Sequence, residues 1–363
     1  MAKYKIAWMP GDGIGNDVLD AAKIILDASG FDADYIPFDI GWEVFRAEGE
    51  PLPARTIEGM KETDAALFGA ITSKSAMDPD TISIQQKHGT KYRSPIVRLR
   101  QTFNLYSNMR PCKAYPGNPL NYRDDVDLVF FRENTEGLYS GVEFQSIPSD
   151  LQKISPMDRY DPEKTAVSLR IFTEEGCQRI IRKAFDYAKE FNWPTVTVIH
   201  KANVIRQTCG MFLRIAKETA PEYSDIEMWE ANVDAFCMWL VKNPQDYGVC
   251  VTSNMFGDIV SDLGAQLVGG LGFASSASTS DSYGLFEPTH GSAPKYAGQY
   301  KVNPTAALLS VKLMWDYLGE RALAKRLETA IATVIKEGKI KTYDLGGTNT
   351  SLEVAEEVAK KMD

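Results

Sequence analysis

Hydrophobic and polar residues follow two different periods along this chain. Short apolar runs predict buried β-strands at residues 4–9, 65–71, 126–131, 195–200 and 248–251. Apolar residues spaced three or four apart predict amphipathic helices at residues 17–28, 173–191 and 305–317. Because strands and helices follow one another through most of the chain, the pattern predicts an α/β fold.

Polar segments interrupt this alternation. Residues 72–93 are rich in Ser, Asp, Gln and Lys, and we expect them to form a long loop. Residues 150–161 are polar and irregular, and residues 286–304 are rich in turn-forming residues. Because long loops inside a compact domain are usually functional, the first segment is a candidate for the edge of a site.

The glycine-rich sequence PGDGIG follows the first predicted strand. Gly11, Gly13 and Gly15 give a GxGxG pattern, whereas the Rossmann fingerprint for dinucleotides is GxGxxG. Asp39 lies near the distance expected of a ribose-binding acid, but any strand–turn–helix unit needs turn glycines and polar strand ends. These residues alone therefore favour an ordinary strand–turn–helix unit over a Rossmann dinucleotide site.

Two carboxylates stand out in the stretch YGVCVTSNMFGDIVSDLGAQLVGGLG. The strand at residues 248–251 leads into a helical pattern that places Asp258 and Asp262 four residues apart on one helix face. The apolar residues around them are expected in the core: Phe256, Ile259, Val260, Leu263 and Leu267. Like charges beside a core favour a bound cation, and carboxylate oxygens suit Mg²⁺ or Mn²⁺. A solvated acidic stripe is the alternative.

Basic residues lie at or near the ends of predicted strands. They are Arg98, Arg100, Arg110, Arg132 and Lys201. Open α/β sheets bind their ligands at the carboxyl edge, and guanidinium groups match carboxylates in bidentate geometry. One such residue alone is more often structural. The whole set, together with the two aspartates, predicts a pocket for a polyanion and a divalent cation.

Composition narrows the class of protein. Of the 363 residues, 44% are hydrophobic, so the chain can bury a large core and form two domains. The net charge of −9 argues against nucleic-acid or membrane partners. The five cysteines show no CxxC spacing and predict reduced thiols, and no apolar run approaches a membrane span. We expect a cytoplasmic protein, although a mitochondrial matrix enzyme without its transit peptide would look the same.

The motifs together resemble one enzyme family. PGDGIG, LR…LY.N.RP, FRENTEGLYSG, HKANV, NMFGDIVSD and EPTHGSAPKYAG…NPTA resemble the β-decarboxylating dehydrogenases, which include isocitrate, isopropylmalate and homoisocitrate dehydrogenases. The resemblance extends from Lys5 to Met362 in the family's order and spacing. It implies that PGDGIG is structural and that the fold is not a Rossmann fold.

The family fold has two α/β domains with the active site in the cleft between them. By resemblance, residues 1–105 and 269–363 would form the large domain on the cofactor side. Residues 106–268 would form the small domain, which carries the dimer interface and the metal residues.

The resemblance also implies a role for each matching residue. Tyr139 would act as a general acid and Lys201 as the residue on the base side. The substrate-binding residues would be Ser94, Arg100, Arg110, Arg132 and Asn203. The ligands of Mg²⁺ or Mn²⁺ would be Asp234, Asp258 and Asp262. The cofactor would contact Ile71, Glu287, His290, Gly291, Ala293, Lys295, Tyr296, Asn303 and Tyr343.

In this family the residues matching Lys201 and Asp234 reach into the active site of the neighbouring subunit. The resemblance therefore implies a homodimer with shared active sites, with a higher oligomer left open. Some family members are instead non-catalytic regulatory subunits of hetero-oligomers, which lose parts of the Arg, Tyr, Lys and Asp set. That set is complete here, which favours an enzyme.

The implied chemistry explains these residue types. Hydride transfer oxidises a 2-hydroxy acid to a ketone, which accepts electrons as CO₂ leaves, and a metal stabilises the developing charge. A lysine beside a metal and several arginines has its cationic form disfavoured, so it can serve as a base. A tyrosine can then protonate the enol carbon.

Single residues and short sequences narrow the choice of substrate. Members that act on isocitrate commonly carry Ser and Asn six and four residues before the first substrate Arg, whereas this chain has Ser94 and Ile96. RQTFNLYSNMRPC favours isocitrate, and SPIV also matches homoisocitrate and some isopropylmalate enzymes. We expect oxidation of isocitrate to 2-oxoglutarate, with homoisocitrate or 3-isopropylmalate as alternatives.

NADP is the expected cofactor, with NAD as the alternative. NAD-specific members usually carry an Asp and an aliphatic residue where this chain has Lys295 and Tyr296, which can donate to a 2′-phosphate. Tyr343 also favours NADP. The DLGG sequence that follows lacks the Arg that some NADP enzymes place there.

Overall fold

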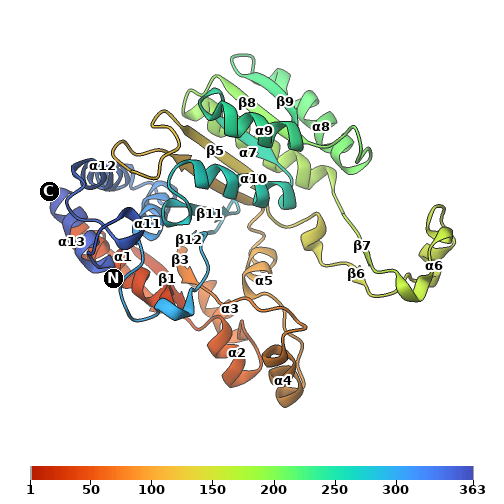
Figure 1. The fold of residues 1–363 in the computed structure, drawn as a ribbon, viewed down its shortest axis with the longest axis horizontal. Coiled ribbons are helices and arrows are strands. Elements are labelled where there is room, and N and C mark those ends of the chain that lie inside the picture. The colour runs from red at the N-terminus through yellow and green to blue at the C-terminus, as the bar shows by residue number, and fades with distance from the viewer. Residues whose placement is uncertain (1, 363) are drawn as a thin grey trace.

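The computed structural model describes residues 2–362, whose main feature is a ten-stranded sheet covered by helices (Figure 1). The strand order is β2-β1-β3-β12-β11-β4-β5-β10-β8-β9. Neighbouring strands are parallel except at β12–β11, β11–β4 and β4–β5. The strands span Tyr4–Gly11 (β1), Ala33–Pro37 (β2), Ala65–Ala70 (β3), Ser107–Lys113 (β4), Asp127–Glu133 (β5), Thr195–His200 (β8), Glu227–Asn232 (β9), Val249–Thr252 (β10), Ser275–Thr279 (β11) and Gly284–Pro288 (β12). The predicted α/β class is confirmed.

The helices divide between the two halves of the sheet. Helices from the two ends of the chain, α1 and α11 to α13, pack together on one half, and α7 to α10 belong to the other (Figure 1). Their bounds are Ile14–Ser29 (α1), Trp42–Glu48 (α2), Ala54–Met60 (α3), Pro79–His88 (α4), Pro95–Thr102 (α5), Ser149–Gln152 (α6), Glu174–Glu190 (α7), Thr208–Thr219 (α8), Val233–Lys242 (α9), Asn254–Leu267 (α10), Thr305–Tyr317 (α11), Arg321–Glu337 (α12) and Ser351–Lys361 (α13).

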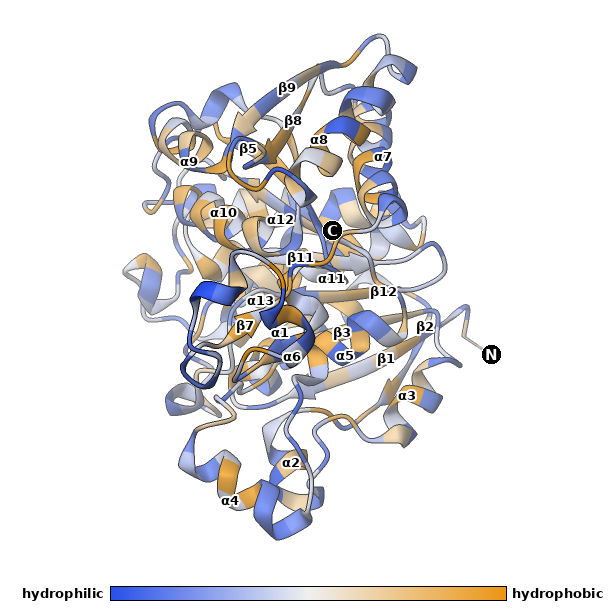
Figure 2. Cartoon of the chain, turned by 90° about the vertical axis from the view of Figure 1, so that its right-hand side faces the viewer, coloured by the Kyte–Doolittle hydropathy of each residue, from blue (hydrophilic) through white to orange (hydrophobic). Residues whose placement is uncertain are grey.

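Amphipathic patterning explains where these helices pack. The helices that cover the sheet, α7 among them, carry both hydrophobic and hydrophilic residues (Figure 2). In α7 the buried residues recur every three or four positions, and Thr173 caps the helix by accepting from the Gly176 N–H. Strand β3, by contrast, is buried at every position because neighbouring elements cover both of its faces.

Buried side chains form separate clusters in the two halves. One large cluster surrounds Trp315 between α1, α11 and α12, and another surrounds Phe185 between α7 and strands β8 and β10. The sheet itself runs without a break from one half to the other. The division into residues 1–105 with 269–363 and residues 106–268 stays a prediction.

The segment at residues 72–93 is not a plain loop, because it contains helix α4. Asp78 caps this helix by accepting from the Asp80 N–H at 2.9 Å, and Pro79 occupies its first turn. Thr81 is its one buried residue. A helix with so little buried surface gives no hydrophobic period, which is why the pattern predicted a loop.

A two-stranded arm leaves the main body between β5 and α7. Its strands, Glu143–Phe144 (β6) and Val167–Ser168 (β7), pair antiparallel, and α6 lies toward its tip (Figure 1). The predicted irregular segment at residues 150–161 falls on this arm, where the one-turn helix α6 and a short 3₁₀ turn add local order. In the part of the chain that the structure describes, no helix is both long and apolar enough to cross a membrane.

The PGDGIG turn is held by a buried carboxylate. Asp12 is 4% exposed and accepts backbone N–H groups from Trp42 at 2.7 Å, Glu43 at 3.0 Å and Thr72 at 2.9 Å. Gly13 adopts a φ of 55°, and a Cβ there would lie 2.2 Å from the Ser292 carbonyl oxygen. The turn therefore ties β1 to α2 and to the cleft-side loops, which is a structural role.

Replacing Asp12 with alanine should destabilise the fold. Three backbone N–H groups, one of them buried and two partly buried, would lose their acceptor, so we expect Asp12→Ala to lower the free energy of unfolding by about 2–4 kcal/mol. Urea denaturation measures the change. Asp34→Ala, at an exposed carboxylate, is the matched control and should change stability little. Equal stabilities of the two variants would contradict this role for Asp12.

Candidate active site

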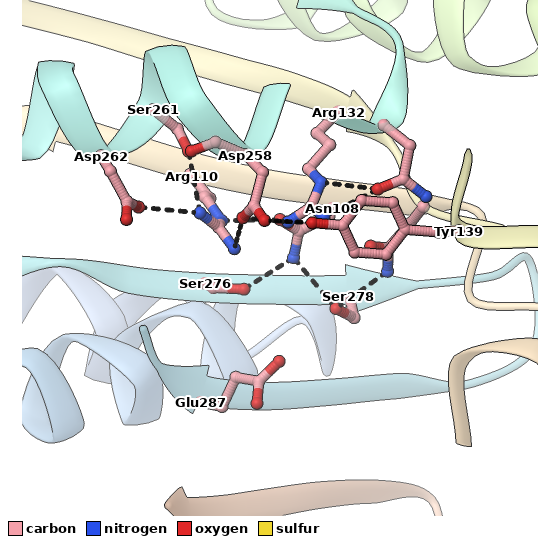
Figure 3. Close-up of polar contacts among 12 residues, drawn as sticks. Asn108, Arg110, Arg132, Tyr139, Asp258, Ser261, Asp262, Ser276, Ser278 and Glu287 are labelled. Atoms are coloured by element: carbon pink, nitrogen blue, oxygen red, sulfur yellow. Dashed lines mark hydrogen bonds and ion pairs between the residues drawn. The ribbon is translucent and has the colours of Figure 1, made fainter. Parts of the chain in front are cut away.

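Helix α10 brings carboxylates over the strands that carry the buried arginines. Asp258 and Asp262 lie one turn apart on this helix, as predicted, and face Arg110 on β4 and Arg132 on β5 (Figure 3). The sequence pattern placed Arg132 just after the predicted strand. In the structure it lies within β5. The side chains thus come together from three elements that are distant in sequence.

Asp258 is the centre of the cluster. Its Oδ1 lies 2.6 Å from Arg132 Nη1 and 3.3 Å from Arg110 Nη2. Its Oδ2 accepts from the Tyr139 hydroxyl at 2.5 Å. Asp262 Oδ1 accepts from Arg110 Nη1 at 3.1 Å. One carboxylate therefore pairs with two guanidinium groups and orients the tyrosine.

Neutral side chains hold Arg110 in place. Arg110 Nε donates to Asn108 Oδ1 at 2.8 Å, and its Nη1 donates to Ser261 Oγ at 2.8 Å. The Asn108 amide in turn donates to the hydroxyls of Ser276 and Ser278 on β11 (Figure 3). Strand β11 thus helps to position the Arg110 guanidinium through the Asn108 amide.

Arg132 is held in the same manner and is 1% exposed. Its Nε and Nη2 donate to Asn254 Oδ1 at 3.0 and 2.7 Å, at the first residue of α10. Its guanidinium lies 5.1 Å from the ring centroid of Tyr139. The start of α10 therefore determines where this arginine points.

A third buried arginine belongs to the other half of the molecule. Arg100 on α5 pairs with Glu287 on β12, with 3.1 Å between Nη2 and Oε1. Arg100, Arg110 and Glu287 line one cleft of about 190 Å³. Its apolar wall includes Phe68, Ile71 and Ile96. The cleft combines anion-binding groups with a hydrophobic surface.

Burial and charge shift the protonation equilibria in the cluster. Burial alone would raise the pKa of Asp258, but Arg132 and Arg110 outweigh it and hold the pKa below its usual range. Burial raises the pKa of Asp262, and Arg110 offsets part of that rise. Burial and the hydrogen bond to Asp258 raise the pKa of Tyr139. At neutral pH, Asp258 is therefore ionised and Tyr139 carries its proton.

Lys201 and Asp234 lie away from this cluster. Lys201 follows β8, and its Nζ is 2.5 Å from Oδ1 of Asp234 in the first turn of α9. Among residues 2–362, no group of three or more His, Cys, Asp or Glu side chains is close enough to hold a metal ion. The structure thus brings two of the three predicted metal ligands together and leaves Asp234 apart.

The two clustered aspartates fit a hard divalent cation in part. Carboxylate oxygens are the ligands such cations prefer, and Asp258 is ionised at neutral pH. Two carboxylates from one chain leave coordination positions for water, substrate or a residue of another copy. The two other predicted substrate residues lie outside the cluster: Ser94 directly precedes α5, and Asn203 is exposed in the turn after β8.

The predicted cofactor residues fall into two groups. The residues that line the cleft beside Arg100 are Ile71, Glu287, His290 and Gly291. The second group is a surface cluster in which the Tyr296 and Tyr343 rings are 5.8 Å apart and Lys295 Nζ lies 4.7 Å from the Tyr296 ring centroid. Ala293 joins the two groups with a φ of 34°, and Asn303 donates to Asp344 behind the cluster.

Some residues at the site gave no signal in the sequence. Asn108, Asn254 and Ser261 orient the arginines, but a hydrogen bond between distant residues leaves no local pattern. Lys301 joins the tyrosine cluster and could have been found by its place in the turn-rich loop. Ile259 was expected in the core, but its side chain is 57% exposed because it lies on the outward face of α10.

Comparisons with known proteins agree on one family. The family model described as isocitrate/isopropylmalate dehydrogenase matches residues 5–360. The chain is 41% identical to a 3-isopropylmalate/3-methylmalate dehydrogenase of Methanocaldococcus jannaschii, covering 99% of both chains. It is 38% identical to an isocitrate/homoisocitrate dehydrogenase of Thermus thermophilus, covering 99% of this chain and 98% of the relative. The crystal structure of an isocitrate dehydrogenase from Methylococcus capsulatus matches with a TM-score of 0.87 at 38% identity, covering 99% of both chains.

Gly257 lets α10 approach Arg132, so a side chain there should disturb the cluster. An added Cβ would lie 2.6 Å from Arg132 Cγ. We expect Gly257→Ala to lower the free energy of unfolding by about 1–3 kcal/mol in urea denaturation. Gly210→Ala in α8 is the matched control, because a Cβ there meets no atom within 4 Å and should stabilise the helix by about 1 kcal/mol. Equal gains in both variants would contradict the close approach.

Proposed function

The chain belongs to the isocitrate/isopropylmalate dehydrogenase family, and we propose that it oxidatively decarboxylates a malate substituted at carbon 3. It is therefore a β-decarboxylating dehydrogenase, as its motifs implied, and the family uses NAD(P) and a divalent metal. The observation that carries the proposal is a group of three buried arginines, Arg100, Arg110 and Arg132, the first two of which line one cleft. Guanidinium groups gathered in this way match the carboxylates of an anionic substrate in bidentate geometry.

In the proposed reaction the arginines bind the two carboxylates that all family substrates share. Arg110 and Arg132 approach from strands β4 and β5, and Arg100 approaches from α5 in the other half of the molecule. In the structure their charges are met by Asp258, Asp262 and Glu287. Substrate carboxylates would take over these contacts in bidentate geometry and so fix the reacting carbon.

Proton transfer falls to Tyr139 and Lys201 in this proposal. Tyr139 keeps its proton at neutral pH and lies beside Asp258, so it can donate to the carbon that loses CO₂. Lys201 would take the proton of the substrate hydroxyl. A cation bound by Asp258 and Asp262 would polarise that hydroxyl oxygen, and the nicotinamide would accept the hydride.

A homodimer would complete the site. Lys201 and Asp234 lie away from the arginine cluster of their own chain, as expected if they serve the neighbouring one. Helix α9 packs against α10 and exposes Met238, Trp239 and Val241. An exposed apolar face of this kind is typical of a subunit interface.

The apolar wall of the cleft supports an alkyl substituent on the substrate. Phe68, Ile71 and Ile96 line the same cleft as Arg100 and Arg110. A third carboxylate would find no donor on those three side chains, whereas an isopropyl group would bury apolar surface against them. We therefore favour 3-isopropylmalate, which is also one of the two substrates named for the relative from M. jannaschii. This choice revises the preference for isocitrate drawn from RQTFNLYSNMRPC.

Isocitrate is the second candidate because of Ser94. This residue directly precedes α5, and its side chain makes no capping hydrogen bond there. Its hydroxyl could instead donate to a distal carboxylate. The structural relative from M. capsulatus and the relative from T. thermophilus both carry isocitrate in their names.

NADP is the cofactor we propose. Lys295 and Tyr296 stand where an Asp would exclude a 2′-phosphate, and Tyr343 lies beside them. These side chains are donors that a phosphate can accept from. NAD remains the alternative within the family.

A shared active site makes a sharp prediction for mixed dimers. We expect Tyr139→Phe and Lys201→Met each to abolish nearly all activity as homodimers. If Lys201 serves the neighbouring subunit, the heterodimer of the two variants contains one intact site and should regain about half of the wild-type activity. Co-expression with two affinity tags gives the pure heterodimer for the assay. A heterodimer as inactive as its parents would contradict sharing.

Substrate choice is tested by two variants on one panel. We expect kcat/KM to be highest for 3-isopropylmalate among isocitrate, homoisocitrate, 3-isopropylmalate and D-malate. Ile96→Asn should lower kcat/KM for 3-isopropylmalate by about tenfold or more, because a carboxamide facing an alkyl group is poorly solvated. Ser94→Ala should leave that value almost unchanged.

The same panel identifies the other substrate if our choice is wrong. A higher kcat/KM for isocitrate than for 3-isopropylmalate would overturn it. In that case Ser94→Ala should cost about 1–3 kcal/mol of transition-state binding to isocitrate. The family reaction would remain intact under either result.

A further inference from the structure

A second lysine lies beside the predicted cofactor residues. Lys301 Nζ is 4.8 Å from the Tyr343 ring centroid and 5.8 Å from that of Tyr296, while Lys295 Nζ is 4.7 Å from the Tyr296 centroid. We call Lys295, Tyr296, Lys301 and Tyr343 the lysine–tyrosine cluster. Two ammonium groups and two phenol rings thus meet on one patch of the surface.

The two lysines of this cluster are not paired with carboxylates in the part of the chain that the structure describes. Among the ion pairs of residues 2–362, none involves Lys295 or Lys301. Hydrogen bonds from Lys295 and Tyr343 lower the pKa of Tyr296, and the charge of Lys301 contributes to the same shift. A patch that stabilises negative charge on a tyrosine would stabilise a phosphate in the same manner.

The backbone on both sides of Lys301 is held by buried groups. Asp17 is 2% exposed and accepts from the backbone N–H groups of Gly298 and Tyr300, both at 3.0 Å. Ser351 donates its N–H to the Tyr300 carbonyl at 2.6 Å and its hydroxyl to the Val302 carbonyl at 2.5 Å. Lys301 therefore starts from a fixed Cα position, which reduces the entropy lost when it binds a ligand.

Tyr300 shows that this fixed position is imposed on the chain. It adopts a φ of 48°, the left-handed region that non-glycine residues seldom occupy. Such a conformation persists when surrounding contacts determine it, and here Asp17 and Ser351 supply those contacts. The loop is thus shaped to present Lys301 beside Tyr343.

We propose that Lys301 supplies the second cation for the 2′-phosphate of NADP and is a determinant of cofactor preference. The inference rests on the proposed use of NADP. The sequence after Tyr343 is DLGG, which leaves that side of the cluster without an arginine. Lys301 lies over the Tyr343 ring and supplies, from a different part of the chain, the positive charge that such an arginine would carry. A phosphate held by two ammonium groups gains charge-assisted hydrogen bonds from both.

Fragment binding tests this role without any turnover. Calorimetry of the purified protein compares adenosine 2′,5′-bisphosphate with adenosine 5′-monophosphate, which differ by the 2′-phosphate. We expect the wild type to bind the bisphosphate more tightly, and Lys301→Met to weaken that binding about tenfold while leaving the monophosphate unchanged. Methionine retains an apolar stem on the Tyr343 ring, so the loss reports on charge. Lys301→Arg should restore binding.

Two further variants calibrate the result. Lys295→Met should weaken bisphosphate binding in the same direction. Lys339→Met, at a lysine whose side chain is 77% exposed and paired with Glu337, should alter neither fragment. In parallel, the ratio of kcat/KM for NADP to that for NAD should fall about tenfold in Lys301→Met.

The outcomes separate this inference from the proposed cofactor. If the wild type binds both fragments equally, the proposed NADP preference fails and the inference fails with it. If the wild type prefers the bisphosphate and Lys301→Met keeps the full preference, the inference alone is overturned. A loss that Lys301→Arg reverses, with Lys339→Met unaffected, supports it.

Discussion

The ion pair between Asp258 and Arg132 is the interaction on which the site depends. Arg132 is almost fully buried, and a buried guanidinium without a carboxylate would cost several kcal/mol. Burial and the neighbouring Arg110 and Arg100 lower the pKa of Arg132, and Asp258 opposes that shift. The carboxylate also binds Arg110 and Tyr139, so one side chain on α10 fixes three functional groups. The position of α10 over the sheet is therefore part of the chemistry.

The alternation of side chains along β4 and β5 lets the same strands serve the core and the site. Arg110 and Arg132 point toward α10, whereas Met109 and Phe131, which are paired across the two strands, point to the opposite face. A shift of either strand by one residue would exchange these faces and bury the guanidinium groups in the apolar core. The Asn108 amide, bound to serines on β11, ties this register to the next strand.

Strong local patterns made much of the fold predictable, whereas contacts between residues distant in the sequence could not be predicted. Strand β8 and helix α11 were predicted with their observed bounds, because each combines a clear period with turn residues at its ends. The helix inside residues 72–93 was missed because Thr81 alone is buried. Ile259 was wrongly predicted to be buried. The spacing of apolar residues shows that a helix has an apolar side, but it does not show whether another element covers that side. The bond between Asn254 and Arg132 joins residues 122 positions apart, which no local pattern reveals.

Charge balance explains why the proposed substrate and cation would bind together. Arg100, Arg110 and Arg132 are matched in the structure by Glu287, Asp258 and Asp262, so the cluster carries no net charge. A dicarboxylate alone would bring excess negative charge into a partly buried site, and a divalent cation alone would bring excess positive charge. Together the two are neutral, so each offsets the electrostatic cost of the other. Lys201 and Asp234 also form a neutral pair, so a neighbouring copy that supplied them would add reactive groups without disturbing this balance.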